Sequence, residues 1–150
     1  MSGNRSSGTA RRDLAIDNAA LDVLGREHSD RARTLPPVAI VIAAYNEEGA
    51  IGPVIQALPA EVCGLATAAI VVADGCADGT AAEAAAVGAM VCDVPVNRGQ
   101  GAALRLGYHL AYSAGAQYIV TTDADGQYDT SELPALLAPI VNGEADFVTG

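Results

Sequence analysis

Asp123 and Asp125 are the residues of this sequence whose type and spacing are best suited to chemistry. They directly follow Tyr118–Thr122, a β-branched and aromatic run that is typical of a strand. In an extended chain both carboxylates point to one side and Ala124 to the other. Like charges this close repel each other, so the spacing favours a hard cation such as Mg²⁺ or Mn²⁺ between them. Gln127 would add a neutral amide oxygen on the same side.

This segment has two other interpretations. A solvated turn after a strand is the ordinary meaning of Asp-x-Asp, because Asp and Gly are common turn residues. A calcium loop of the EF-hand type is excluded, because Gly126 directly follows Asp125 and Pro134 stands where the loop needs a glutamate. The choice between a turn and a metal site therefore depends on what the rest of the chain brings to the same place.

The overall composition predicts one folded domain in the cytoplasm. The chain has 150 residues, 51% of them hydrophobic, and no apolar run long enough to span a bilayer. No signal-peptide core follows Met1. Cys63, Cys76 and Cys92 lack the spacing of a disulfide or zinc framework, so free thiols are expected. Peripheral contact at the inner face of the membrane is left open.

The charge distribution narrows the class of ligand. All eight basic residues are arginines, and only Arg98 and Arg105 lie after residue 37. They stand against thirteen acidic residues, so the region from Val38 onward carries a net charge of −11. This charge argues against a nucleic-acid partner. A diphosphate would need a bridging cation, helix N-termini and backbone amides to bind here.

The order of the predicted elements indicates a parallel α/β sheet. Residues 1–37 are interpreted as a mobile N-terminal arm with a weak, short helix capped by Asp13. Buried strands are predicted after it, with another strand beginning near the end of the chain: Val38–Ala44, Ala68–Ala73, Ala89–Val94, Tyr118–Thr122 and Ala145–Thr149. Helices with one apolar stripe alternate with these strands, which is the pattern of right-handed crossovers.

Helix caps are predicted from polar residues at the expected starts. Asn46 is the expected cap of the first crossover helix, and Thr80 with Glu83 forms a capping box for the second. A glycine-rich loop, Asn97–Gly101, opens the third helix, and Asp129 caps the last one.

Polar clusters follow four of the strands. Because ligands of parallel sheets bind beyond the carboxyl ends of the strands, the clusters are expected to converge at one edge. They comprise Tyr45–Glu47, Asp74 with Asp78, Asn97–Gly101 and Asp123–Gln127. Their convergence favours a site over a solvated turn. A dinucleotide fold is not supported, because no Gly-x-Gly-x-x-Gly follows the first strand, and a Walker loop is excluded because the chain has no lysine.

Four motifs, in this order and spacing, resemble the family 2 inverting glycosyltransferases of GT-A fold. The likeness runs from about Val38 to Asp146 and looks greatest to dolichyl- or polyprenyl-phosphate mannose and glucose synthases. The motifs are Ala44-Tyr45-Asn46-Glu47-Glu48, Val72-Ala73-Asp74-Gly75-Cys76-Ala77-Asp78-Gly79-Thr80, Asn97-Arg98-Gly99-Gln100-Gly101-Ala102-Ala103-Leu104 and Asp123-Ala124-Asp125-Gly126-Gln127.

The resemblance implies a hexosyl transfer from a UDP- or GDP-sugar, with inversion, to a polyprenyl phosphate or another hydroxyl acceptor, as in cell-wall or glycolipid biosynthesis. Asp123, Asp125 and Gln127 would hold Mg²⁺ or Mn²⁺ against the diphosphate. The implied nucleotide-sugar residues are Ala44, Tyr45, Glu47, Asp74, Asn97, Gly101, Asp123, Ala124 and Asp125.

The sequence departs from the family pattern at three places. Ala73 replaces a frequent Asp, which leaves the nucleobase open, and Gln100 replaces a frequent Lys. The chain also ends at Gly150, before the acceptor half in which the relatives carry the catalytic base, so 38–150 is expected to be an incomplete donor-binding region. Two alternatives remain: a nucleotide-binding module without turnover, and a sugar nucleotidyltransferase.

Overall fold

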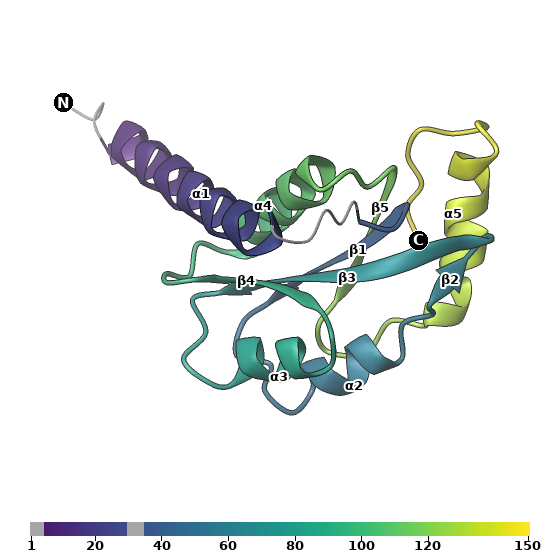
Figure 1. Ribbon diagram of the computed structural model, residues 1–150, viewed down its shortest axis with the longest axis horizontal. Helices are drawn as coiled ribbons and strands as arrows, with labels where there is room; N and C mark the ends of the chain where they lie inside the picture. Colours follow the sequence, from purple (N-terminus) through teal and green to yellow (C-terminus); the bar gives the residue numbers. More distant parts are fainter. Residues whose placement is uncertain (1–4, 30–34) are drawn as a thin grey trace.

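The sheet is built from short apolar strands that lie side by side with their carboxyl ends at one edge (Figure 1). The structure, a computed structural model, describes the backbone of residues 5–29 and 35–150, and the side chains of residues 8–22 and 35–150. Within this part of the chain, parallel strands run in the order β4, β3, β1 and β5. Their bounds are β1 (Val38–Ala44), β3 (Leu65–Asp74), β4 (Met90–Val94) and β5 (Tyr118–Asp123).

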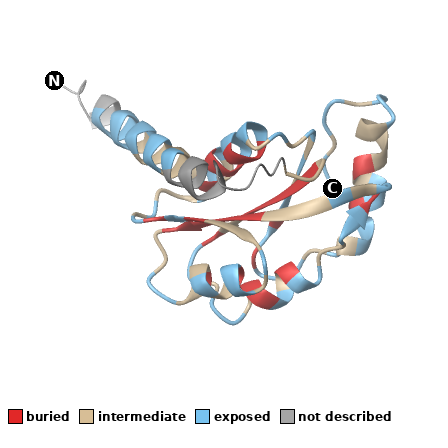
Figure 2. Cartoon of the chain, in the orientation of Figure 1, coloured by how far each residue is buried: buried red, intermediate tan, exposed pale blue. Residues whose placement is uncertain are grey.

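The predicted parallel α/β sheet is confirmed. The first strand has the predicted bounds, and the next three differ by at most three residues at an end. A two-residue strand that the pattern did not predict, β2 (Glu61–Val62), pairs antiparallel with the start of β3. All but one residue of β1 are buried, because helices cover the sheet on both faces (Figure 2).

Helices pack on both faces of the sheet (Figure 1). On one face, α4 (Gln100–Ser113) places Leu106 and Leu110 against side chains of β1 and β3. On the other face lie α2 (Ile51–Gln56) and α3 (Thr80–Ala86). A turn of 3₁₀ helix, η1 (Thr130–Glu132), leads into α5 (Leu133–Val141), which packs near β2. Asp129, the predicted cap of the last helix, caps the preceding turn η1, since its Oδ1 accepts the N–H of Ser131 at 2.9 Å, and the cap position of α5 itself is held by Glu132 without a side-chain hydrogen bond.

The N-terminal segment forms α1 (Arg5–Ser29), a helix that begins well before the predicted cap at Asp13. It projects from the sheet beside α4 (Figure 1). No described side chain of this helix is buried, but Ile16, Ala20 and Leu21 are half-buried against the core between α4 and the sheet. The mobility predicted for residues 1–37 stays a prediction, and residues 1–4 and 30–34 of that arm lie outside the described residues.

The expected capping box of Thr80 and Glu83 is wrong, because both side chains bind the loop after β1 instead. The Thr80 hydroxyl accepts the N–H of Glu47 at 2.8 Å. The Glu83 carboxylate accepts the N–H groups of Gly49 at 2.6 Å and Gly52 at 2.9 Å. A Cβ on Gly52 would lie only 2.6 Å from Glu83 Oε1. The loop after β1 is thus fastened to α3.

Asn46 is not the cap of the first crossover helix either. Its Oδ1 accepts the N–H of Ala77, in the loop after β3, at 2.8 Å. Its φ of 51° lies in the left-handed region, which Asn tolerates better than most residues. The cap position of α2 is held by Ala50, which makes no side-chain hydrogen bond. Loop-to-loop bonding has therefore replaced local capping at two adjacent helices.

The predicted strand at Ala145–Thr149 is also wrong, since these residues are not part of any ladder. The segment lies across a cavity of about 660 Å³ from β5, and Phe147 is 80% exposed. Strand propensity alone does not form a strand, because a neighbour must supply the ladder hydrogen bonds.

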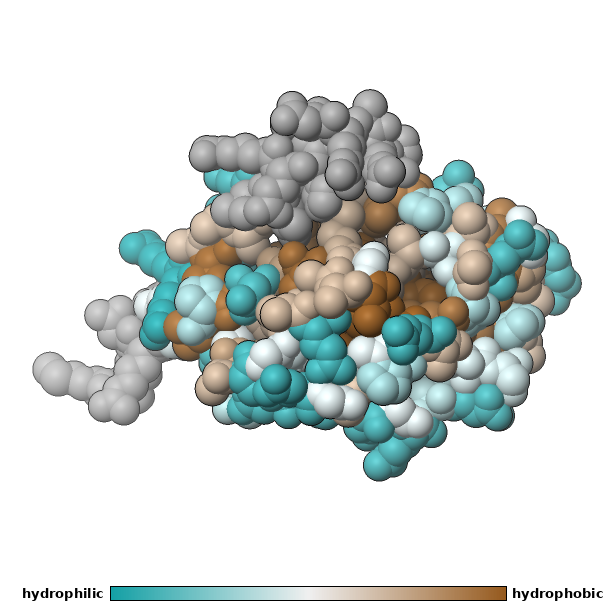
Figure 3. All heavy atoms as spheres, turned by 60° about the horizontal axis from the view of Figure 1, so that its bottom comes forward, coloured by the Kyte–Doolittle hydropathy of each residue, from teal (hydrophilic) through white to brown (hydrophobic). Residues whose placement is uncertain are grey.

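In the described part of the chain no helix is both long and apolar enough to cross a membrane. On the face shown in Figure 3, polar residues surround smaller apolar areas.

Replacing Gly107 by alanine is expected to destabilise the fold. The new Cβ would lie 2.3 Å from Val41 Cγ1, where α4 meets β1, and such overpacking costs about 1–3 kcal/mol. Gly101→Ala in the same helix is the control, because its Cβ meets nothing within 4 Å. Urea unfolding should show a lower midpoint for Gly107→Ala only. Equal midpoints would contradict the packing described for α4.

The carboxylate of Asp78 is expected to make the free energy of unfolding fall as the solution becomes acidic. Its pKa is lowered from the ordinary value of 3.8, chiefly by the hydrogen bond from the Thr80 hydroxyl. A lowered folded-state pKa stabilises the protein above pH 3.8, and this stabilisation is lost as the pH falls through the folded value. Wild type should therefore exceed Asp78→Asn in unfolding free energy at pH 6, with the gap closing towards pH 3. A gap that is constant with pH would contradict this assignment.

Candidate functional site

A cavity of about 420 Å³ opens where the carboxyl ends of β1, β3 and β5 meet the start of α4. Its position follows from the register of the sheet, which sets Ala43 beside Asp123 and Ala44 beside Ala73. The residues that line it are Ala43, Tyr45, Glu47, Asp74, Asn97, Gln100, Ala103, Asp123, Ala124 and Asp125. All four predicted clusters contribute, so the expected convergence is observed.

Seven of the nine predicted nucleotide-sugar residues line this cavity: Tyr45, Glu47, Asp74, Asn97, Asp123, Ala124 and Asp125. Ala44 does not, because side chains alternate along β1, and Ala44 is 2% exposed within the core on α2. Ala43, which pairs with Asp123, lines the cavity instead.

Gly101 does not line the cavity either, although the loop that contains it does. The lining positions in α4 are Gln100 and Ala103, which lie three residues apart on one side of the helix. Gln100 belongs to the predicted polar cluster Asn97–Gly101, but neither it nor Ala103 is among the predicted nucleotide-sugar residues. Helical periodicity from a correctly placed helix start could have found both residues.

The Asp123–Asp125 pair has the alternation that the sequence predicted. Both carboxylates are exposed, whereas Ala124 between them is 5% exposed and packs in the core. Gln100 Nε2 lies 3.4 Å from Asp123 Oδ1, and the N–H of Gln127 donates to Asp125 Oδ1 at 3.0 Å. The side chain of Gln127 does not line the cavity, so its predicted role as a third metal ligand stays a prediction.

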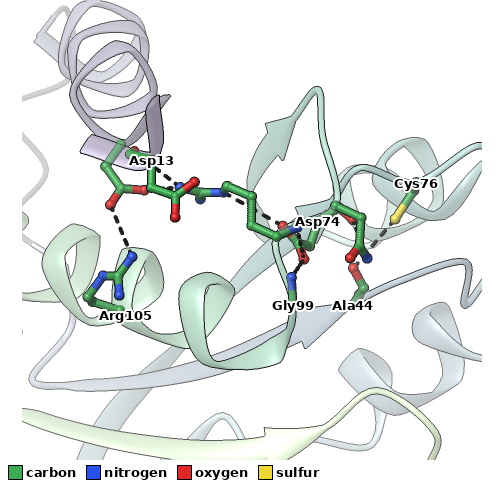
Figure 4. A network of polar contacts seen from close by, with 9 residues as sticks. Asp13, Ala44, Asp74, Cys76, Gly99 and Arg105 are labelled. Carbon is green, nitrogen blue, oxygen red and sulfur yellow. Dashed lines mark hydrogen bonds and ion pairs between the residues drawn. The ribbon is translucent and has the colours of Figure 1, made fainter. Parts of the chain in front are cut away.

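Asp74 fastens the end of β3 to the turn that begins α4 (Figure 4). Its side chain is 4% exposed, and Oδ2 accepts the backbone N–H groups of Arg98 at 3.0 Å and Gly99 at 2.8 Å. Asn97 Nδ2 donates to the Asp74 carbonyl at 3.2 Å. Gly75 has φ +69° and a Cβ there would lie 2.1 Å from the Asn97 nitrogen, so only glycine fits between the two loops.

The cavity is strongly acidic. Its lining includes four carboxylates, those of Glu47, Asp74, Asp123 and Asp125, and no basic side chain. No cluster of three or more His, Cys, Asp or Glu side chains suited to a metal occurs among the residues that the structure describes. The candidate metal ligands are therefore the Asp123–Asp125 pair, with room for oxygen atoms from a ligand or water. Such a site suits Mg²⁺, which keeps several waters and is held by one or two carboxylates plus substrate phosphates.

Cys76 connects two loops and is not part of the cavity lining. Its Sγ donates to the Ala44 carbonyl at 3.5 Å and accepts the N–H of Asn46 at 3.4 Å, which joins the loops after β1 and β3 (Figure 4). It does not line the cavity.

Comparison with known proteins places this geometry in a family. The family model described as glycosyl transferase family 2 matches residues 39–150. The low-salt glycan biosynthesis hexosyltransferase Agl6 of Haloferax volcanii is 34% identical over 116 residues, which are 77% of this chain and 27% of that protein. A UDP-N-acetylglucosamine–dolichyl-phosphate N-acetylglucosaminyltransferase of Methanococcus voltae is 39% identical over 54 residues, which are 36% of this chain and 22% of the relative.

A solved structure gives the same result for the fold. The crystal structure of glucosyl-3-phosphoglycerate synthase from Mycobacterium tuberculosis, in complex with Mn²⁺, UDP and glucosyl-3-phosphoglycerate, superposes with a TM-score of 0.56 at 30% sequence identity. The superposition covers 83% of this chain and 44% of the synthase. The chain thus spans less than half the length of each of these three proteins. From the family match, the identities and the shared GT-A fold, we conclude that the chain belongs to glycosyl transferase family 2.

Proposed function

We propose that this chain is the donor-binding region of a glycosyltransferase that moves a hexosyl group from a UDP-sugar or GDP-sugar, with inversion, using Mg²⁺ or Mn²⁺. The observation that carries the proposal is that Asp123 and Asp125 line the same cavity as Asp74 and as Gln100, the first residue of α4. A carboxylate pair and a helix N-terminus at one cavity are what a metal-bridged diphosphate needs.

The charge of the cavity supports the metal. A diphosphate brought among four carboxylates with no lining cation would be repelled, whereas a divalent ion held by Asp123 and Asp125 reverses the sign locally. When bound, the metal neutralises charge on the leaving nucleoside diphosphate, which is worth several kcal/mol. The chain's own part is to hold the two carboxylates at the end of β5 and to present the free backbone N–H groups of the first turn of α4.

The nucleoside is assigned to the other end of the cavity. Tyr45 is 53% exposed and lines the wall with Glu47, so its ring is available for contact with a base or ribose. Asp74 is held rigid by the two N–H groups it accepts. Ala73, which stands where relatives have an acid, is fully buried and adds no polar group. We favour UDP over GDP, because the solved relative contains UDP and the Methanococcus voltae relative is named for a UDP-sugar.

The acceptor is proposed to carry a phosphate. Of the named relatives, one is named for transfer to dolichyl phosphate and one for the synthesis of glucosyl-3-phosphoglycerate, and polyprenyl phosphate at the inner face of a membrane is the acceptor we propose. No residue of this chain is assigned as the catalytic base, which we place in the half of the fold that the longer relatives possess. Cell-wall or glycolipid biosynthesis is the corresponding role.

The two alternatives have different support. A sugar nucleotidyltransferase would need a basic glycine-rich loop after β1, but that loop carries Glu47 and Glu48 and no basic residue. A nucleotide-binding module without turnover would share the whole described cavity, so only an assay of sugar transfer separates it from the proposed enzyme.

The direct test is calorimetric titration of the 150-residue chain with UDP and with GDP, each with Mn²⁺ and again with excess chelator. We expect UDP to bind with Mn²⁺ and to lose measurable binding with chelator, because the cavity has no cation of its own for the diphosphate. Tighter binding of GDP would reverse the base assignment. Binding of UDP that is indifferent to chelator would contradict the metal-bridged site.

A substitution at the carboxylate pair tests the metal ligands separately. Asp125→Asn should weaken UDP binding in Mn²⁺ by at least about tenfold, which is about 1.4 kcal/mol, because it removes one of two anionic ligands. Asp93→Asn is the matched control, since Asp93 is an exposed carboxylate on β4 that does not line the cavity. Direct titration with Mn²⁺ alone should show the same order of affinities. Equal loss in both variants would mean that only overall charge matters.

A further inference from the structure

The two basic side chains that follow residue 37, Arg98 and Arg105, meet at one carboxylate of the N-terminal helix. Arg98 Nη1 lies 2.7 Å from Asp17 Oδ1, and Arg105 Nη2 lies 3.9 Å from Asp17 Oδ2. Arg98 Nη1 also donates to the carbonyl of Asp13 at 3.2 Å. Figure 4 shows this network running from α1 at Asp13 to Asp74 and Gly99, with Arg105 reaching α1 from α4.

Arg98 connects this helix to the wall of the donor cavity. Its side chain is 4% exposed and held by α1, while its backbone N–H donates to Asp74 Oδ2. The neighbours of Arg98 in the turn include two cavity residues, Asn97 and Gln100. The position of the Arg98 side chain therefore bears on the geometry of the cavity, although that side chain is not part of its lining.

The burial of the Arg98 side chain makes its ion pair with Asp17 important. A guanidinium in a nearly closed environment needs a partner, because an unpaired buried charge is costly. Arg98 Nε and Nη2 have no hydrogen-bond partner within the described structure, and Asp74 Oδ1, itself without one, is 4.0 Å from Nε. Asp17 is thus the carboxylate in direct contact. Without it, Arg98 would move toward Asp74 or toward solvent, and either movement would disturb the turn at Arg98–Gly99.

The packing of α1 explains why Asp17 stands at this place. Ile16, Ala20 and Leu21 pack against the core between α4 and the sheet, and they flank Asp17 along the helix. Three and four residues are the spacings that share a helix face, so Asp17 and Leu21 face the body together. The apolar contacts set the helix on the body, and the carboxylate is thereby presented to both arginines.

We propose that α1 supports the donor site indirectly, with Asp17 as a positioning residue that holds Arg98 and so fixes the turn between β4 and α4. The proposal rests on the proposed donor-binding function. In this arrangement α1 influences the affinity of the donor-binding region for the nucleotide, although the helix does not contact the nucleotide.

Two measurements on the full 150-residue chain test this inference: UDP titration in the presence of Mn²⁺, and hydrogen exchange of the segment 97–101. Asp17→Asn should weaken UDP binding about tenfold, the lower range for partners that orient a binding residue. It should also speed exchange at Arg98 and Gly99, whose N–H groups donate to Asp74, while exchange in β1 and β3 stays as in wild type.

The control and the rescue use the same helix. Asp22→Asn removes an equal charge from α1 at an exposed position and should leave both measurements as in wild type. Asp17→Glu keeps the carboxylate and should restore most of the affinity.

Other results would overturn the proposed role of Asp17 or the proposed function. Wild-type affinity and wild-type exchange in Asp17→Asn would overturn the proposal. Faster exchange throughout the sheet in Asp17→Asn would assign Asp17 to general stability and overturn it as well. If wild type binds neither nucleotide, the proposed function fails, and the exchange at 97–101 still shows whether Asp17 holds the turn.

Discussion

The site depends on one buried carboxylate, that of Asp74. A parallel sheet brings the ends of its strands together, but it does not fix the loops beyond them. Asp74 does so by accepting two backbone N–H groups from the turn that starts α4, at 3.0 and 2.8 Å. Charge-assisted bonds of this kind are roughly twice as strong as neutral ones. They hold the turn from which α4 begins, and Gln100 and Ala103 of that helix line the cavity.

Around this anchor the loops support one another rather than their own helices. Thr80 and Glu83 of α3 bind the loop after β1, and Asn46 of that loop binds the loop after β3. Asn46, Thr80 and Glu83, which local rules assign to helix caps, instead join segments that are far apart in the sequence. The result is a rim in which Asn46 and Glu47 are held by hydrogen bonds to residues 31 and 33 positions away in the sequence. Hydrogen bonds between distant segments thus hold the loops of this rim to one another.

Features set by neighbouring residues in the sequence could be predicted, whereas features set by distant residues could not. Strand positions came from local apolar runs, and the rule that parallel strands end at one edge then predicted that Asp74, Asn97 and Asp123 would meet. The errors concern features that depend on distant partners. That Ala43 and not Ala44 lines the cavity depends on the register that sets Ala43 beside Asp123 of β5. That Ala145–Thr149 is not a strand depends on the absence of a neighbouring strand that would share ladder hydrogen bonds with it in the described structure. The pairing of Asp17 with Arg98, 81 residues apart, has no local signal at all.

The distribution of charge connects these features to the proposed chemistry. The body of the chain has two cationic side chains, and both are engaged by Asp17 on α1 rather than directed into the cavity. The cavity is left with four carboxylates, an arrangement that would repel a nucleoside diphosphate if the protein acted alone. Under the proposed function, affinity for such a ligand would come from a cation taken from solution and held by Asp123 and Asp125, of which Asp123 lies 3.4 Å from the side chain of Gln100 at the start of α4. Because Asp17 pairs with both arginines, the proposed role of α1 and the proposed need for a metal concern the same two cations.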